Sequence, residues 1–326
     1  MSRLRALTGI KPSGTPHLGN YLGALRPALQ LQQTHDTLYF IADYHALTTV
    51  REPAQLKKHI YDLVAVFAAL GMDFDQHTFF RQSDIPEVTE FSWILSCITA
   101  KGLLERAHAF KDAQSKQQEV NLGLFCYPIL QAADILLYDS NFVPVGKDQK
   151  QHLEMTRDIA LRFNHLYGED ALVVPEPLIG EEVATIPGLD GQKMSKSYNN
   201  VIPLFAPAKQ VRKSIMRIQT DSLGVEDPKD PDGCNIFALY ALLAEKDAVS
   251  KMRTSYEKGG FGYGHAKQAL YELILEKFKA ERAQYTYLMS NKNEIDDALS
   301  IGAGKAKKIA KLVLHRVRQK VGYADI

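Results

Sequence analysis

The segment LDGQKMSKSYNN, residues 189–200, carries two lysines in a setting that suits phosphate binding. Lys193 and Lys196 follow an Asp-Gly turn and stand three residues apart. The segment is too polar for a core and too rich in Gly and Asn for a regular element, so we expect a loop, called the lysine loop below. Two point charges on flexible stems suit a lid that closes on a polyphosphate. A solvated surface turn is the ordinary alternative.

A second candidate is KPSGTPHLGN, residues 11–20, called the KPSG turn below, which joins an expected strand to an expected helix. Gly14 and Gly19 permit tight turns and a close approach of a ligand to the backbone. The start of the following helix offers free N–H groups to an anion. The pattern is neither the dinucleotide fingerprint GxGxxG nor the P-loop GxxxxGKS/T. A plain connection between strand and helix is the competing interpretation.

Two further segments carry candidate acids. VPVGKDQKQH, 143–152, again passes from a strand end into a helix. Gly146 allows backbone approach there, and Asp148 suits the ribose of a nucleotide, although it could simply cap the helix. In YPILQAADILLY, 127–138, Asp134 stands among apolar neighbours. A buried carboxylate needs a partner, which is more commonly a salt bridge than a ligand.

The elements that must position these residues alternate between strand and helix up to residue 200. Strand patterns are expected at 4–10, 37–43, 77–82 and 142–145. Helical patterns are expected at 21–33, 53–70, 86–112, 127–138 and 149–163. This alternation predicts an α/β fold with a doubly wound parallel sheet, in which ligands bind beyond the carboxyl ends of the strands. Residues 201–326 show helical periodicity, so we expect a second, all-helical domain with the lysine loop at the junction.

Composition fits a globular protein, with 45% hydrophobic and 24% charged residues among 326. A formal net charge of +1 gives no overall signal for nucleic acid, yet residues 301–326 hold seven basic residues against one acid. Three widely spaced cysteines suggest neither a zinc site nor a disulfide framework. No apolar run reaches the roughly 18 residues of a membrane span. We expect a cytoplasmic protein without a membrane partner.

These motifs together resemble one family. PHLGN resembles the HIGH motif, and KMSKS the KMSKS motif, of class I aminoacyl-tRNA synthetases. The segments 9–27, 127–164 and TDSLG, 220–224, are similar to bacterial tryptophanyl-tRNA synthetases, and the resemblance runs over nearly the whole chain. It implies a Rossmann-like catalytic domain, 1–200, that binds ATP and the amino acid. It also implies a helical tRNA (anticodon)-binding domain, 201–326, whose last helix packs back on the first domain.

The resemblance further implies a two-step reaction. The carboxylate of L-tryptophan attacks the α-phosphate of ATP, which carries Mg²⁺, and gives tryptophanyl-adenylate and pyrophosphate. The acyl group then passes to tRNA(Trp). No metal site on the protein is implied beyond the Mg²⁺ carried by ATP. A homodimer is implied as well.

The site residues follow from the same resemblance. Those placed at the reacting phosphates are Lys193, Lys196, His17 and Asn20. Those expected to bind ATP are Lys11, Pro12, Ser13, Gly19, Asn20, Lys111, Gly146, Lys147, Asp148, Val183, Lys193, Met194, Ser195, Lys196 and Ser197. Those expected to bind tryptophan are Asp134, Gln149, Tyr127, Gln131, His45 and Leu7.

The choice between tryptophan and tyrosine depends on two positions. Gln131 departs from bacterial tryptophan enzymes, which usually have methionine there. Leu7 stands against tyrosine, because tyrosine enzymes usually place a tyrosine at this position to pair with the substrate hydroxyl. A buried unpaired polar group costs about 1–3 kcal/mol, so we favour tryptophan. A tyrosine–tRNA ligase, an adenylating nucleotidyltransferase without a tRNA substrate, and a nucleic-acid-binding module on a vestigial catalytic fold are the alternatives.

Overall fold

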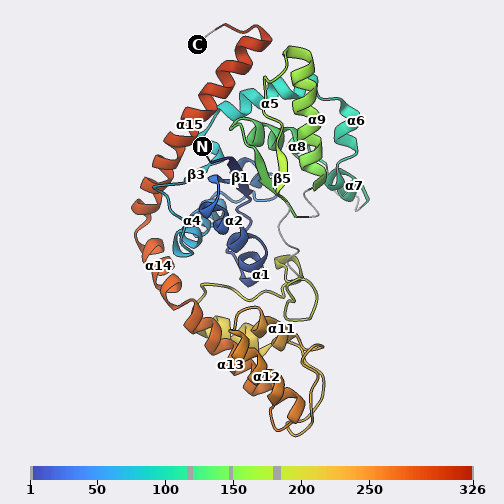
Figure 1. The fold of residues 1–326 in the computed structure, drawn as a ribbon, viewed down its shortest axis with the longest axis vertical. Helices are drawn as coiled ribbons and strands as arrows, with labels where there is room; N and C mark the ends of the chain where they lie inside the picture. Colours follow the sequence, from blue (N-terminus) through green and yellow to red (C-terminus); the bar gives the residue numbers. More distant parts are fainter. Residues whose placement is uncertain (1–2, 116–119, 147–149, 179–184, 325–326) are drawn as a thin grey trace.

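A five-stranded parallel sheet forms the centre of the molecule (Figure 1), in the order β3-β2-β1-β4-β5. The computed structural model describes residues 3–115, 120–146, 150–178 and 185–324. The strands are β1 Arg5–Ile10, β2 Asp36–Ile41, β3 Thr78–Arg81, β4 Phe142–Pro144 and β5 Glu176–Leu178. Residues 37–41 of β2 are all buried, as expected for a parallel strand that is covered on both faces. The predicted α/β fold with a doubly wound parallel sheet is confirmed.

The connection from β1 to β2 consists of several short helical pieces where the sequence predicted one helix. They are α1 Leu18–Asn20, the π-helix η1 Tyr21–Leu25, α2 Arg26–Gln30 and the 3₁₀ helix η2 Leu31–Gln33. Pro27 lies in the first turn of α2 and has no N–H to donate. The hydrogen-bond pattern therefore changes at this join.

The other helices of the sheet region lie on its two faces. They are α3 Asp43–Ala46, α4 Pro53–Ala69, the 3₁₀ helix η3 Gln82–Asp84, α5 Glu87–Ile98, α6 Lys101–Glu105, α7 His108–Ser115, α8 Leu122–Leu136 and α9 Lys150–Tyr167. The predicted helical stretch 86–112 is thus divided, and the helix expected at 127–138 begins earlier. Asn121 caps α8, because its Oδ1 accepts from the N–H of Leu124 at 2.9 Å.

The sheet separates two cores. Tyr39, Ile41 and Phe79 face α4 and share one continuous core with buried residues from the stretch 202–299. Leu38, Phe40 and Phe80 lie in the other core, with residues of α5, α8 and α9. Both cores therefore include the second half of the chain, the first through residues 202–299 and the second through residues 306–317.

Helices dominate the chain after the lysine loop. They are the 3₁₀ helix η4 Lys196–Tyr198 within that loop, α10 Ala208–Met216, α11 Asn235–Ala241, α12 Lys246–Lys258, α13 Tyr263–Lys277, α14 Lys279–Ser290 and α15 Lys292–Val321. Figure 1 shows α11–α13 gathered below the sheet, while α14 and α15 return along its side. The boundary between two domains at residue 200 stays a prediction. No described helix is both long enough and apolar enough to cross a membrane.

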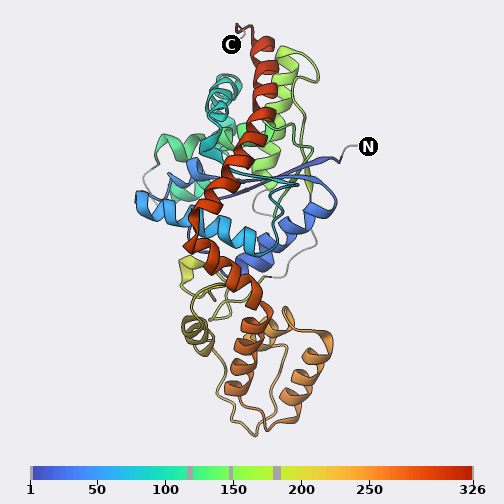
Figure 2. The same cartoon turned by 90° about the vertical axis from the view of Figure 1, so that its left-hand side faces the viewer.

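The long helix α15 lies along the edge strand β3. A Cβ atom at Gly302 would stand 1.8 Å from the carbonyl oxygen of Phe79, so only glycine allows this approach. Lys305 Nζ donates to the carbonyl oxygens of Phe74 at 2.9 Å and Asp75 at 2.7 Å. In Figure 2, which looks from the left-hand side of Figure 1, α15 crosses in front of the sheet. The edge strand is therefore covered by a segment from the far end of the sequence.

Candidate active site at the carboxyl ends of the strands

The lysine loop is closed on the KPSG turn, which follows β1. A Cβ atom at Gly14 would lie 2.9 Å from Lys196 Nζ, so the ammonium group stands against the backbone there. Gly14 has a φ of +124°, which L residues rarely adopt. At the other end of the turn, the N–H of Gly19 donates to Sδ of Met194 at 3.2 Å. The structure thus brings two sequence candidates into contact.

Asn200 holds the lysine loop in shape. This residue is only 2% exposed. Its Nδ2 donates to Asp190 Oδ1 at 2.7 Å and to the carbonyl oxygen of Lys193 at 3.1 Å, while its Oδ1 accepts from the N–H of Ser195 at 2.8 Å. Asn200 was not predicted as a site residue. The available signal was an amide, able both to donate and to accept, at the end of a polar loop.

His17 and Asn20 form a reciprocal cap at the start of α1. The N–H of Asn20 donates to His17 Nδ1 at 3.3 Å, and the N–H of His17 donates to Asn20 Oδ1 at 3.1 Å. Burial, with the nearby charge of Lys196, lowers the pKa of His17 to about 4. The ring is therefore neutral at pH 7. Because Nδ1 accepts, the ring proton is assigned to Nε2, which is the nitrogen able to donate to a phosphate oxygen.

The cations of this region differ in their surroundings. Lys11 Nζ donates to Thr48 Oγ1 at 3.0 Å, and burial lowers its pKa. The Lys196 side chain is exposed as a whole, but the desolvation of its ammonium end lowers its pKa, and the charge of Asp62 partly offsets this. Lys193 is exposed. Two of the three cations are thus partly desolvated beside the KPSG turn, where a polyphosphate would meet them.

Asp134 is buried, with 2% of its surface exposed, and both of its oxygens have partners. His45 Nε2 lies 2.8 Å from Oδ2, and Gln82 Nε2 lies 2.8 Å from Oδ1 and 2.9 Å from Oδ2. Burial raises the pKa of the Asp134 carboxyl, and the hydrogen bonds from His45 and Gln82 act against this. Gln82 was not predicted as a site residue, although it is the last residue of the third expected strand, 77–82.

Three further residues predicted to bind tryptophan are Tyr127 and Gln131, on the same helix as Asp134, and Leu7, in the core that contains residues of that helix. Tyr127 and Gln131 precede Asp134 on α8 by seven and three residues, which places all three on one face of the helix. Tyr127 Oη is hydrogen-bonded to His152 Nε2, and burial raises the pKa of Tyr127 to about 12. Leu7, on β1, is 1% exposed and belongs to the core that also holds residues of α8.

Most of the remaining predicted site residues are exposed or lie outside the described residues. Pro12 is buried, whereas Ser13, Ser197, Lys111 on α7 and Gly146 after β4 are exposed. Lys147, Asp148, Gln149 and Val183 lie outside the described residues, and their roles stay predictions.

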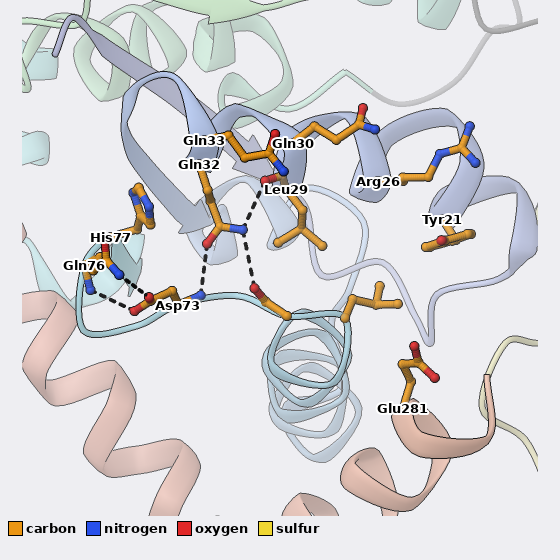
Figure 3. Close-up of a pocket in the computed structure, with 12 residues that line it drawn as sticks. Tyr21, Arg26, Leu29, Gln30, Gln32, Gln33, Asp73, Gln76, His77 and Glu281 are labelled. Atoms are coloured by element: carbon orange, nitrogen blue, oxygen red, sulfur yellow. Dashed lines mark hydrogen bonds between the residues drawn. The ribbon is translucent and has the colours of Figure 1, made fainter. Parts of the chain in front are cut away.

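A hollow of about 470 Å³ lies at the opposite ends of the strands (Figure 3). Gln32 crosses it, donating to the carbonyl oxygen of Leu29 at 3.1 Å and accepting from the N–H of Asp73 at 2.9 Å. Gln33 and His77, on its wall, precede β2 and β3. Parallel sheets of this kind bind ligands at the carboxyl ends of their strands, so we place the active site at the KPSG turn instead.

The basic residues of α15 divide into two groups. Lys305 holds the turn before β3, as described above, while Arg316 pairs with Asp139 and Arg318 with Glu90. These three stabilise the fold. Lys308 and Lys311 are exposed, so only part of the basic excess in the sequence is available to a polyanion.

Comparison with known proteins places the chain among relatives of one kind. A family model described as tRNA synthetases class I (W and Y) matches residues 1–279. A tryptophan–tRNA ligase of Fusobacterium nucleatum is 48% identical over 318 residues, which cover 98% of this chain and 98% of that protein. One of Pseudomonas aeruginosa is 46% identical over 334 residues, which cover 99% of this chain and 74% of that protein.

A solved structure is similar over the same extent. It is the tryptophanyl-tRNA synthetase of Campylobacter jejuni, complexed with ADP and tryptophan. It superposes with a TM-score of 0.94 at 45% sequence identity, and the match covers 98% of this chain and 100% of that chain.

Proposed function

The chain belongs to the class I tRNA synthetases for tryptophan and tyrosine and acts as a tryptophan–tRNA ligase, and we propose that the KPSG turn, the lysine loop and the Asp134 cluster are its active site. The observation that carries this proposal is the contact of Lys196 with the turn at Gly14. A cation stands there beside the helix start that would receive the phosphates of ATP.

Asp134 recognises the indole ring in this proposal. One carboxylate oxygen accepts the indole N–H, while His45 and Gln82 hold the carboxylate in place. Leu7 offers an apolar wall, which suits an indole and gives a phenol hydroxyl no further partner beside Asp134. Tyr127 and Gln131 line the same helix face, and Gln149 contacts the α-ammonium.

The chemistry is an in-line displacement at phosphorus. A carboxylate oxygen of tryptophan bonds to the α-phosphorus, the bond to the oxygen that bridges the α- and β-phosphates breaks, and pyrophosphate leaves with that electron pair. Such reactions need positioning and neutralisation of charge more than covalent help. Lys196 and Lys193 neutralise the leaving pyrophosphate, and His17 and Asn20 contact the phosphates. Gly146, Lys147 and Asp148 hold the ribose, and Val183 packs near the adenine.

The partners follow from the reaction. Mg²⁺ enters with ATP, because phosphate oxygens are ligands that this ion prefers. The tryptophanyl group passes to the terminal adenosine of tRNA(Trp), and charging of tRNA for protein synthesis implies a cytoplasmic location. A second copy of the chain completes a homodimer, which sedimentation equilibrium would test.

The deciding experiment is ATP–pyrophosphate exchange with tryptophan or tyrosine as the amino acid. We expect tryptophan to support exchange and tyrosine to be a far weaker substrate. Asp134→Ala should raise the KM for tryptophan much more than the KM for ATP, because only the indole contact is lost. Equal losses for both substrates, together with a lower Tm, would show that Asp134 has a structural role only.

A further inference from the structure

Asp62, on α4, joins the KPSG turn to the helices of the second half of the chain. The residue is fully buried. Thr15 Oγ1, in the turn, donates to Asp62 Oδ2 at 2.7 Å, and Tyr285 Oη, on α14, donates to Oδ1 at 2.8 Å. Lys58 Nζ, one helical turn away on α4, donates to Oδ2 at 2.8 Å. One carboxylate therefore connects three segments that are far apart in the sequence.

The carboxylate is held in its charged form by these contacts. Burial alone would raise the pKa of Asp62, but the hydrogen bonds from Lys58, Thr15 and Tyr285 outweigh it and hold the pKa below the usual value. A buried charge is stable only while its partners remain in place. The positions of Thr15 and Tyr285 are therefore coupled through Asp62.

The turn that Asp62 holds is the one on which the lysine loop closes. Thr15 directly follows Gly14, where the ammonium group of Lys196 stands. Asp62 is also close enough to act on the charge of Lys196. A change at Asp62 thus reaches both sides of the contact between loop and turn.

Helix α14 carries Tyr285, which contacts Asp62 at Oδ1, whereas Thr15 of the KPSG turn contacts Oδ2. The helix packs along α4, and besides Tyr285 a second tyrosine bridges the same region. Tyr61, on α4, donates its hydroxyl to the carboxylate of Asp296 on α15. Its Oη lies 2.8 Å from Oδ1 and 3.0 Å from Oδ2. The two bridges are alike in chemistry, but only the one through Asp62 reaches the KPSG turn.

We propose that Asp62 is a positioning residue for adenylate formation, which fixes the KPSG turn beneath the lysine loop and ties its position to α14. The inference rests on the proposed role of that turn in binding ATP. Asp62 does not touch the substrate; it acts through Thr15. Removal of the Thr15 or the Tyr285 hydroxyl loosens the turn, and small misplacements of a bound reactant are costly in rate.

The test compares Thr15→Val and Tyr285→Phe with Tyr61→Phe in ATP–pyrophosphate exchange. Tyr61→Phe is the matched control, because it removes a tyrosine hydroxyl that donates to an aspartate beside the same helix without contact to the turn. We expect Thr15→Val to lower kcat/KM for ATP by about tenfold, with the KM for tryptophan unchanged. Tyr285→Phe should lower it by a smaller factor, and Tyr61→Phe should reduce Tm without this effect.

The double variant Thr15→Val/Tyr285→Phe makes the test specific. Because both hydroxyls act through one carboxylate, the loss in the double variant should be smaller than the product of the single losses. Kinetics of Thr15→Val and Tyr285→Phe that match those of Tyr61→Phe would overturn the inference while leaving the proposed function intact. A wild-type chain without tryptophan-dependent exchange would overturn both.

Discussion

At the scale of single residues, Lys196 is a cation that is placed before its substrate arrives. Its ammonium group already stands at Gly14, so little rearrangement is needed when charge develops on the leaving pyrophosphate. We expect Lys196→Ala to slow adenylate formation by at least about tenfold, the loss of a charge-assisted contact, with tryptophan affinity little changed. Rapid-quench measurement of the first turnover would check this, with exposed Lys101→Ala on α6 as the control. Adenylate formation at the wild-type rate would reduce the lysine loop to a surface turn.

His17 makes stability depend on pH. Its pKa is lowered to about 4 from an ordinary 6.5 by burial and by the charge of Lys196. Between these two values the unfolded chain binds more protons than the folded one. The free energy of unfolding should therefore fall as the pH is lowered through this window, by up to about 1.4 kcal/mol per pH unit from this residue. Urea unfolding of wild type and His17→Gln between pH 4 and 7 would measure it, and identical slopes would contradict it.

The charged residues of the candidate site could be predicted from the sequence. The amide side chains that hold them in place could not. Lys193 and Lys196 stand out as two cations in one short loop, and Asp134 stands out as an acid among apolar residues of a helix. Gln82 and Asn200 are ordinary amides whose importance arises only when distant segments meet. Gln82 comes within 2.8 Å of Asp134 across 52 residues of chain, and no local pattern contains that distance.

At the scale of elements, Gly302 decides how closely α15 can approach β3. A Cβ atom there would stand 1.8 Å from the carbonyl oxygen of Phe79, so Gly302→Ala must displace the helix and should reduce the free energy of unfolding by about 1–3 kcal/mol. Gly304→Ala is the matched control in the same helix, because no atom beyond the neighbouring backbone of α15 lies within 4 Å of its Cβ position. Alanine there should stabilise by up to about 1 kcal/mol. Denaturant unfolding of the two variants checks both signs, and equal effects would refute the close contact.

Strands β1–β4 were predictable within about two residues, because each is an apolar run between turn signals. Strand β5 was not expected. Its three residues, Glu176–Leu178, include Pro177, which cannot donate to a ladder and argues against a central strand. Its place at the edge of the sheet makes the proline tolerable, but that place is known only once the strand order is known.

At the scale of the whole molecule, the helix α15 has both bound and free cations. Lys305, Arg316 and Arg318 are engaged with the rest of the fold, whereas Lys308 and Lys311 are exposed and available to tRNA phosphates. We expect Lys308→Glu/Lys311→Glu to raise the KM for tRNA and to flatten its dependence on salt, with pyrophosphate exchange unchanged. Aminoacylation assays across a salt series would measure this, beside Lys101→Glu as the control. An unaltered KM at low salt would show that this face is only solvated.

Because α15 covers β3 but is synthesised much later, the edge of the sheet is uncovered during translation. The ribosome completes β3 at Arg81 and begins α15 at Lys292, so the 210 residues 82–291 are made between the two. At about 5–20 residues per second, this interval is roughly 10–40 s. Throughout it, the nascent chain has an edge strand without its covering helix, and open edges promote pairing between chains. A polypeptide interrupted before α15 is therefore expected to aggregate through β3, whereas in the finished chain α15 covers that edge.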